Sequence, residues 1–216
     1  MSMAPTFIKV CGLTRETDVD AAVAAGVDAV GFNLWPGSAR HVTLARAREL
    51  AARLPDTVKP VLLFVNAPPP LVEQALQALP RAWVQFHGDE APADCAVVNR
   101  SYWRAVQVDA QLDLRAFAHA FSGASALVLD APSAQWGGSG TRFDWALIPR
   151  DLPLPVVLSG GLDADNVGGA ITQVRPWAVD VSSGVEAATK GIKDADRMAR
   201  FCAAVRAADA MRNSSQ

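Results

Sequence analysis

The feature that most limits the fold of this sequence is a regular alternation of two kinds of segment. Short runs rich in β-branched and aromatic residues alternate with longer, Ala-rich amphipathic runs from end to end. The first kind is typical of strands and the second of helices. The expected strands cover 7–11, 28–34, 60–65, 82–87, 102–108, 126–130, 155–161 and 177–184. Each leads into an expected helix, although a long loop, APSAQWGGSGTRF, separates the sixth strand from a short helix at Asp144.

Several of these strands are almost continuously apolar, which is typical of a parallel sheet covered by helices. Eight strand–helix units in 216 residues favour a closed (β/α)8 TIM barrel. The alternative is a flavodoxin-like open sheet, which needs about five strands and would leave the others unexplained. We see no break in composition and no linker, so we expect a single (β/α)8 barrel domain at 1–210 and a disordered polar tail at 211–216.

Composition excludes several classes of partner. The net charge is −2 and Lys and Arg form no dense run, which argues against nucleic acid and anionic membranes. Cys11, Cys95 and Cys202 are far apart and not spaced like metal ligands, so we expect free thiols in a reducing compartment, the cytoplasm. We expect no secretory leader, and no apolar run approaches the roughly 20 residues of a membrane span.

Polar and small residues gather where the expected strands end. In a (β/α)8 barrel the carboxyl ends of the strands form the active site. The residues at these ends are Cys11, His87, Asp130, Ser159-Gly160-Gly161 and Ser182-Ser183-Gly184. They are therefore our candidate site residues.

Glycine-rich segments follow the last three strands. SGG at 159–161 and SSG at 182–184 each follow a strand, and WGGSGT, with Gly138 and Gly140, follows the sixth. Glycine frees backbone amides to bind anions, and the loops after strands seven and eight of such barrels commonly hold a phosphate. Tight turns are the simpler alternative, but three such segments together favour a phosphate site.

Cys11 and Asp130 are the candidates for chemistry. Cys11 could be a small buried hydrophobic residue, or a nucleophile or base whose pKa a positive local field would lower. Asp130 ends an apolar run, where burial without a partner would be costly. No helix follows it directly for it to cap, so we favour a catalytic carboxyl group.

Other charged residues have more than one interpretation. His87 could be a base, a ligand contact or a structural histidine, and the structural interpretation is somewhat favoured. Arg40, in the loop after the second strand, could bind a substrate carboxylate or be a solvated charge. Asp180 interrupts the eighth strand, where a buried partner is expected. Lys9 shares a strand face with Cys11, so it should point into the barrel and need a carboxylate there.

Several motifs together resemble the phosphoribosylanthranilate isomerase family. They are KVCGLT, DAVGFNLWPGSARHV, LFVN, VQFHGDE, LDAP followed by WGGSGTRFDW, LSGGLDADNV and AVDVSSGVEAATKGIKD. They occur in the family's order over essentially the whole chain. We treat 186–194, EAATKGIKD, as a slightly loose linker.

The resemblance implies an Amadori rearrangement of N-(5′-phosphoribosyl)anthranilate to 1-(2-carboxyphenylamino)-1-deoxyribulose 5-phosphate in tryptophan biosynthesis, with no metal or organic cofactor. By matching motif, Cys11 is the general base, Asp130 the general acid and Arg40 the contact to the anthranilate carboxylate. The glycine-rich segments match the family's phosphate-binding site. This chemistry needs a protonated Asp130 and an ionised Cys11, whose pKa we therefore expect to be lowered.

Alternatives within and outside this class remain. Another phosphosugar barrel, such as an aldolase or synthase, would need a strand-end lysine, and a metal-dependent epimerase would need several His and carboxylate ligands. A non-catalytic phosphate-ligand sensor would lack the acid or the base. The expected partner is a small-molecule substrate, and the chain could be a monomer or a homodimer.

Overall fold

The computed structural model describes residues 4–96, 98–133 and 140–214 of the chain. Its eight strands form a closed, parallel barrel in which each strand pairs with the next and β1 pairs with β8. The strands are β1 Phe7–Cys11, β2 Ala29–Asn33, β3 Lys59–Phe64, β4 Trp83–Phe86, β5 Tyr102–Gln107, β6 Ala126–Asp130, β7 Val156–Leu158 and β8 Ala178–Val181. The predicted (β/α)8 barrel is therefore confirmed.

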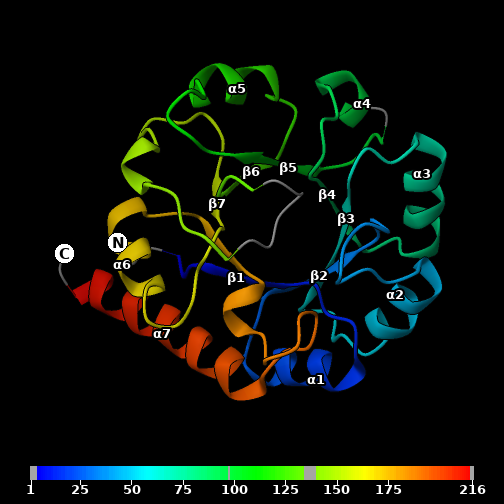
Figure 1. Ribbon diagram of the computed structural model, residues 1–216, viewed down its shortest axis with the longest axis horizontal. Coiled ribbons are helices and arrows are strands. Elements are labelled where there is room, and N and C mark those ends of the chain that lie inside the picture. Colours follow the sequence, from blue (N-terminus) through cyan, green and yellow to red (C-terminus); the bar gives the residue numbers. More distant parts are fainter. Residues whose placement is uncertain (1–3, 97, 134–139, 215–216) are drawn as a thin grey trace.

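A ring of helices surrounds this barrel (Figure 1). The ring consists of α1 Glu16–Ala24, α2 Leu44–Ala51, α3 Pro69–Ala78, α4 Pro92–Ala96, α5 Leu114–Ala120, α6 Val167–Val174 and α7 Ala195–Ser214, with short 3-10 helices η1 Trp145–Leu147 and η2 Ser183–Val185. None of the helices in the described ranges combines the length and the hydrophobicity needed to cross a bilayer.

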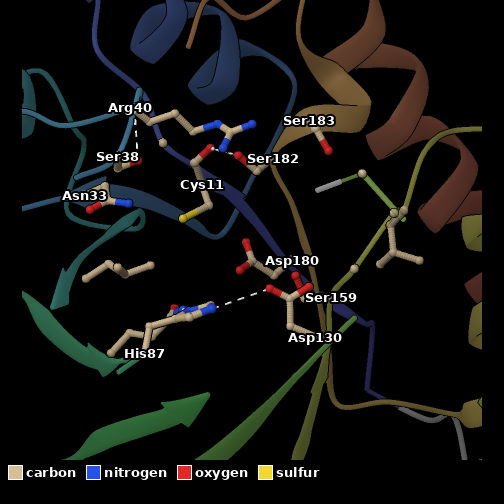
Figure 2. A pocket seen from close by; sticks show the side chains of 17 residues that line it. Cys11, Asn33, Ser38, Arg40, His87, Asp130, Ser159, Asp180, Ser182 and Ser183 are labelled. Atoms are coloured by element: carbon tan, nitrogen blue, oxygen red, sulfur yellow. Dashed lines mark hydrogen bonds and ion pairs between the residues drawn. The ribbon is translucent and has the colours of Figure 1, made fainter. Parts of the chain in front are cut away.

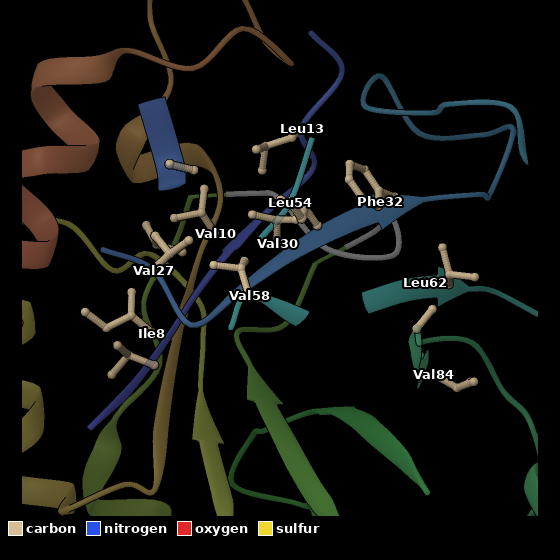
Figure 3. Packing of buried hydrophobic residues seen from close by; sticks show 14 of the residues in the cluster. Ile8, Val10, Leu13, Val27, Val30, Phe32, Leu54, Val58, Leu62 and Val84 are labelled. Atoms are coloured by element: carbon tan, nitrogen blue, oxygen red, sulfur yellow. The ribbon is translucent and has the colours of Figure 1, made fainter. Parts of the chain in front are cut away.

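The two-residue repeat of β1 sorts its side chains between two environments. Ile8 and Val10 are fully buried in the layer between the strands and the helices, with Val30 and Leu62 from neighbouring strands (Figure 3). Because successive side chains of a strand point to opposite faces, Phe7, Lys9 and Cys11 lie on the inner face. They mark three levels of the barrel interior, from its amino-terminal end to its mouth.

Aromatic side chains fill the amino-terminal end of the barrel. The ring of Phe7 stacks on Trp177, with centroids 5.1 Å apart, and on Trp83, at 5.7 Å. Trp103 meets both tryptophans edge-on and is only 2% exposed. This packing places apolar bulk at one end of the barrel and leaves the other end for polar groups.

Some predicted boundaries were wrong. β7 stops at Leu158 and β8 at Val181, because the Ser-Gly-Gly and Ser-Ser-Gly segments after them leave the strand conformation. The expected disorder from 211 onward was wrong for 211–214, since α7 continues to Ser214. Arg212 anchors this last turn by donating to Asp209 Oδ1 at 2.9 Å and to the Ala4 carbonyl at 3.3 Å. Residues 215 and 216 lie outside the described part.

Candidate active site

A pocket opens at the carboxyl ends of the strands and gathers most of the predicted site residues (Figure 2). Its lining consists of Cys11, Gly12, Asn33, Ser38, Arg40, Leu63, Gln85, His87, Asp130, Gly140, Ser159, Gly160, Gly161, Leu162, Asp180, Ser182 and Ser183. Two predicted residues are missing from this set. Gly138 lies outside the described residues, and Gly184 packs against the Leu162 carbonyl, which a Cβ would meet at 1.9 Å.

Cys11 reaches the pocket because β2 carries a glycine opposite it. Cys11 pairs in register with Gly31, and a Cβ on Gly31 would lie 2.6 Å from the Cys11 sulfur. Cys11 as a whole is 8% exposed. Burial raises its pKa, and the Lys9 ammonium opposes that shift only in part. The expected lowering of the Cys11 pKa was therefore wrong for the free protein, because the loss of hydration outweighs the nearby positive charge.

Lys9 has the carboxylate partner that its inward position required. Its ammonium lies 2.7 Å from Asp180 Oδ2, and both side chains are buried. Burial raises the pKa of Asp180, although Lys9 opposes the shift. Asp180 Oδ1 is buried and has no hydrogen-bond partner among the described residues. This oxygen belongs to a pocket residue, so a ligand or water can satisfy it.

Asp130 and His87 face each other across one side of the pocket (Figure 2). His87 Nε2 lies 3.5 Å from Asp130 Oδ2, and the Gln85 amide nitrogen lies 3.1 Å from His87 Nδ1. If neutral, a His87 ring that accepts from Gln85 at Nδ1 carries its proton on Nε2, facing Asp130. The other Asp130 oxygen accepts from the Ala131 amide at 2.8 Å. His87 thus contacts the predicted acid and also lines the pocket.

The glycine-rich loops meet on the side of the pocket that Asp130 borders. Gly160 and Gly161 have φ of +80° and +62°, and Gly140, from the loop after β6, has φ of +73°. A Cβ on Gly160 would lie 2.6 Å from the Ala131 amide nitrogen and 3.0 Å from Asp130 Oδ1. Glycine is needed there because the loop turns left-handed and passes directly beside the carboxyl group. Successive turns of this kind expose backbone amides to an anion.

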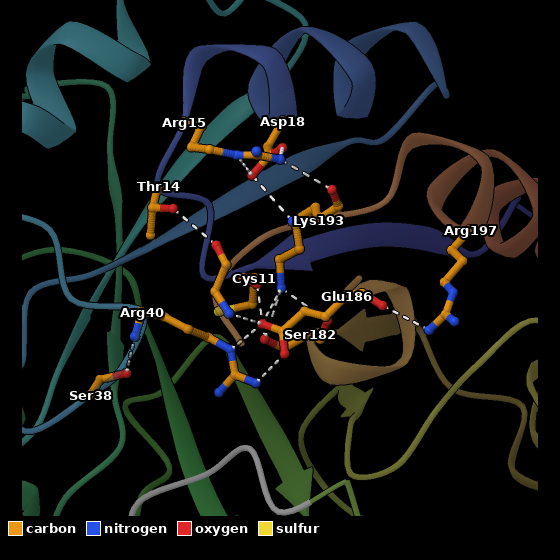
Figure 4. Close-up of polar contacts among 11 residues, drawn as sticks. Cys11, Thr14, Arg15, Asp18, Ser38, Arg40, Ser182, Glu186, Lys193 and Arg197 are labelled. Carbon is orange, nitrogen blue, oxygen red and sulfur yellow. Dashed lines mark hydrogen bonds and ion pairs between the residues drawn. The ribbon is translucent and has the colours of Figure 1, made fainter. Parts of the chain in front are cut away.

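Arg40 belongs to a buried ionic cluster that the sequence analysis missed (Figure 4). Its Nε and Nη2 donate to the two Glu186 oxygens at 2.6 and 2.9 Å. Lys193 Nζ donates to Glu186 Oε1 at 3.2 Å and to the Ser182 carbonyl at 2.9 Å. Ser182 Oγ in turn donates to the Cys11 carbonyl at 3.0 Å. The cluster thus links the loops after β1, β2 and β8.

The segment 186–194 is therefore not a loose linker. Glu186 and Lys193 pair across it as an isolated antiparallel bridge. Burial alone would raise the pKa of Glu186, but the hydrogen bonds and charges of Arg40 and Lys193 lower it. Burial lowers the pKa of Lys193, against the attraction of Glu186. The sequence did offer one signal: directly after the last strand, a short segment begins with an acid, Glu186, and has a lysine, Lys193, near its end.

Within the described residues, no three His, Cys, Asp or Glu side chains are grouped so that they could hold a metal ion. The pocket instead combines a thiol, a carboxyl group, a buried guanidinium and left-handed glycine loops after β6 and β7. These features define a class, the (β/α)8-barrel enzymes that act on phosphorylated small molecules.

Comparisons with known proteins identify the family within this class. A family model described as N-(5′phosphoribosyl)anthranilate (PRA) isomerase matches residues 8–204, and the chain belongs to this family. The N-(5′-phosphoribosyl)anthranilate isomerase of Leptothrix cholodnii is 57% identical, over 97% of this chain and 95% of its own.

Solved structures of the same family also match this chain. Phosphoribosyl anthranilate isomerase from Thermotoga maritima superimposes with a TM-score of 0.86 at 37% identity, covering 94% of this chain and 99% of that one. A phosphoribosyl anthranilate isomerase in complex with reduced 1-(o-carboxyphenylamino)-1-deoxyribulose 5-phosphate has a TM-score of 0.83 at 35% identity, with the same coverage.

Proposed function

We propose that this chain isomerises N-(5′-phosphoribosyl)anthranilate to 1-(2-carboxyphenylamino)-1-deoxyribulose 5-phosphate, a step of tryptophan biosynthesis. One observation carries the proposal: a thiol and a carboxyl group, Cys11 and Asp130, line the same pocket beside left-handed glycine loops. Membership of the isomerase family supports it, as does the related isomerase that binds the reduced product.

In this proposal the substrate lies across the mouth of the barrel. Its phosphate binds the backbone of Gly160 and Gly161, with Ser183 and Gly140 beside them. Its anthranilate carboxylate pairs with Arg40, whose Nη1 is the guanidinium nitrogen that Glu186 does not use. The ribose then lies between Cys11 and Asp130, and the unpartnered Oδ1 of Asp180 accepts from a ribose hydroxyl.

Ring opening is the first step. Asp130 donates a proton to the ring oxygen while the bond between that oxygen and C1′ breaks. The lone pair of the anthranilate nitrogen forms a double bond to C1′, which gives a protonated Schiff base. The Nε2–H of a neutral His87 stabilises the Asp130 carboxylate that remains, since the two groups lie 3.5 Å apart. General acid catalysis of this kind contributes about 10²–10⁴-fold.

Proton removal follows. Cys11 takes the proton from C2′, and the electrons of that bond form a C1′–C2′ double bond while the Schiff-base electrons return to nitrogen. The resulting enolamine takes a proton at C1′ while its C2′ hydroxyl releases a proton, which gives the ketone. C2′ is thereby oxidised and C1′ reduced, and no outside oxidant is required. The cationic Schiff base favours the thiolate, which opposes the effect of burial on the Cys11 pKa.

Every residue in this scheme comes from one chain. We therefore propose that each barrel holds a complete site, whether the protein is a monomer or a homodimer. We also propose that it works in the cytoplasm, since its three cysteines are buried and free.

Substitution of the acid and the base tests the proposal. Cys11→Ala and Asp130→Asn should each lower kcat by about 100- to 10,000-fold, and the reduced product should still bind. Cys202→Ala and Asp20→Asn, at a buried thiol in α7 and an exposed carboxylate in α1, are matched controls that should keep activity. Near-normal turnover in Cys11→Ala or Asp130→Asn contradicts that residue's role. Failure of the soluble wild-type protein to rescue a tryptophan auxotroph lacking the isomerase contradicts the activity itself.

A further inference from the structure

We propose that Glu186 is a positioning residue that fixes the guanidinium of Arg40, and that the buried cluster of Arg40, Glu186 and Lys193 selects ligands carrying a carboxylate on the aromatic ring. The inference rests on the proposed function, because it assigns the partner of Arg40 in that reaction. Glu186 and Lys193 act through Arg40 and need not touch the substrate themselves.

The geometry holds Arg40 from two directions. Glu186 accepts from Nε and Nη2 along one edge of the guanidinium, which fixes the plane of the group (Figure 4). The aliphatic stem lies against the backbone at Gly12, where a Cβ would meet Arg40 Cδ at 2.4 Å and φ is +78°. A guanidinium clamped in this way loses little further freedom when it binds a ligand.

Glu186 is itself anchored. Its Oε1 accepts from the Gly191 amide at 3.0 Å as well as from Lys193 at 3.2 Å. The side chains of Arg40 and Glu186 are each 7% exposed, and that of Lys193 is fully buried. Glu186 is therefore held in place by the loop after β8, and it orients the guanidinium of Arg40 in the loop after β2.

The charges of the cluster do not balance. Arg40 and Lys193 are two cations and Glu186 is one anion, all shielded from water. The neighbouring ion pairs, Lys9 with Asp180 and Arg15 with Asp18, are each balanced within themselves. An excess positive charge in a poorly hydrated place is costly, so an anionic group that enters beside Arg40 is favoured. A ring carboxylate supplies that charge, and a ligand without it leaves the excess uncompensated.

Two ligands test this selection by binding alone. They are reduced 1-(o-carboxyphenylamino)-1-deoxyribulose 5-phosphate and the same compound made from aniline, which lacks the carboxylate. Glu186→Gln keeps the shape of the side chain but loses the charged acceptor. Removal of the Glu186 charge increases the positive excess, but it also releases the guanidinium of Arg40 from its fixed plane, and we expect the loss of orientation to dominate. Binding of the carboxylated ligand should therefore weaken by roughly 10- to 100-fold, and binding of the aniline compound should stay nearly unchanged. In turnover, KM for the substrate should rise far more than kcat falls.

A double-mutant cycle separates positioning from general structural damage. If Glu186 acts through Arg40, then Glu186→Gln added to Arg40→Leu should cost no further affinity for the carboxylated ligand. Glu16→Gln is the matched control, since Glu16 pairs with Arg46 on the surface, away from the pocket. It should leave both affinities unchanged.

The inference is overturned if Glu186→Gln weakens the binding of both ligands equally. It is also overturned if the effects of Glu186→Gln and Arg40→Leu on the affinity for the carboxylated ligand are fully additive. If Glu186→Gln does not fold by circular dichroism, Glu186→Asp, which keeps the charge but is too short to span both nitrogens, gives the same contrast between ligands. Turnover by the wild type tests the proposed function separately. Suppose that the wild type turns over the substrate, but Glu186→Gln does not weaken binding of the carboxylated ligand more than binding of the aniline compound. The role proposed for Glu186 is then rejected, and the proposed function stands.

Discussion

At the scale of single residues, the candidate base depends on an absent side chain in the neighbouring strand. Gly31 lies opposite Cys11 in the register of β1 and β2, and its missing Cβ provides the space for the sulfur. The thiol is thereby directed into the pocket rather than against the strand. Its orientation is a matter of packing, and one methyl group is enough to change it.

Gly31→Ala tests this dependence. The new Cβ would lie 2.6 Å from the Cys11 sulfur, so the thiol must move by a substantial part of an ångström. Because a displacement of about 1 Å at a reacting group can cost about 100-fold, we expect kcat to fall by about that factor in steady-state assays. Gly169→Ala, in α6, is the control, since nothing lies within 4 Å of its added Cβ. Unchanged kcat in Gly31→Ala would show that the thiol does not need its present position.

The pH dependence of the reaction follows from the thiol as well. In the proposed mechanism Cys11 and Asp130 together hold one proton, which must be on Asp130 and not on Cys11 for the reaction to proceed. The pair keeps one proton until the pH is high enough to ionise the thiol. Burial raises the pKa of Cys11 in the free protein. We therefore expect kcat/KM, which reports the free enzyme, to start falling only above about pH 8.5, the usual thiol value. A pH–rate profile measured from 6 to 10 checks this, and an alkaline midpoint below that value contradicts it.

At the scale of elements, ion pairs join the first two helices of the ring. Glu16 of α1 pairs with Arg46 of α2, and Asp20 of α1 pairs with Arg53, just after α2. These groups are exposed, and pairs of this kind contribute little to stability at neutral pH. What they contribute is lost as the carboxylates take up protons, so they also make stability depend on pH.

The pair of Glu16 and Arg46 should appear in acid unfolding. Its hydrogen bonds with Arg46 lower the pKa of Glu16 to about 2, against about 4.3 in an unfolded chain. The folded form therefore gains stability above the unfolded value and loses it as pH falls toward the folded value. Glu16→Gln should make the free energy of unfolding less sensitive to pH between about 4.5 and 2, measured by urea denaturation. Arg46→Gln should have a similar effect, and an unchanged slope in both variants would contradict the pairing.

At the scale of the whole molecule, the two ends of the barrel have different tasks. The amino-terminal end is closed by Phe7, Trp83, Trp103 and Trp177, from segments far apart in the chain. The carboxyl end carries the pocket, and the buried pair of Lys9 and Asp180 lies between the two. Stability and chemistry can therefore be altered separately, as the layered filling of such barrels suggests.

Trp103→Ala tests that separation. Removing a fully enclosed aromatic ring should lower the free energy of unfolding by about 3–5 kcal/mol, measured by chemical denaturation, while the KM of the folded protein stays near the wild-type value. Trp177→Ala, at a ring that is 40% exposed, should cost less. A large change in KM for Trp103→Ala, under conditions where the variant is folded, would show that the two ends are coupled.

The sequence by itself determined the features that arise from local repetition. Alternation along β1 predicted that Lys9 and Cys11 share the inner face and that Lys9 needs an acid, and Asp180 provides it. The eight strand–helix units predicted the closed barrel. Because all parallel strands end at one edge, the residues after them were predicted to meet, and Cys11, Arg40, His87 and Asp130 line one pocket.

Only the tertiary structure decided the features that depend on distance through space and on access of water. Glu186 and Lys193 gained a role because closure of the barrel brings the β8 loop against Arg40, 146 positions away from Glu186 in the chain. The direction of the Cys11 pKa depended on how completely the folded chain removes water from the sulfur. The order of residues does not specify such contacts locally, since desolvation and ion pairing are set by all the segments that surround a group.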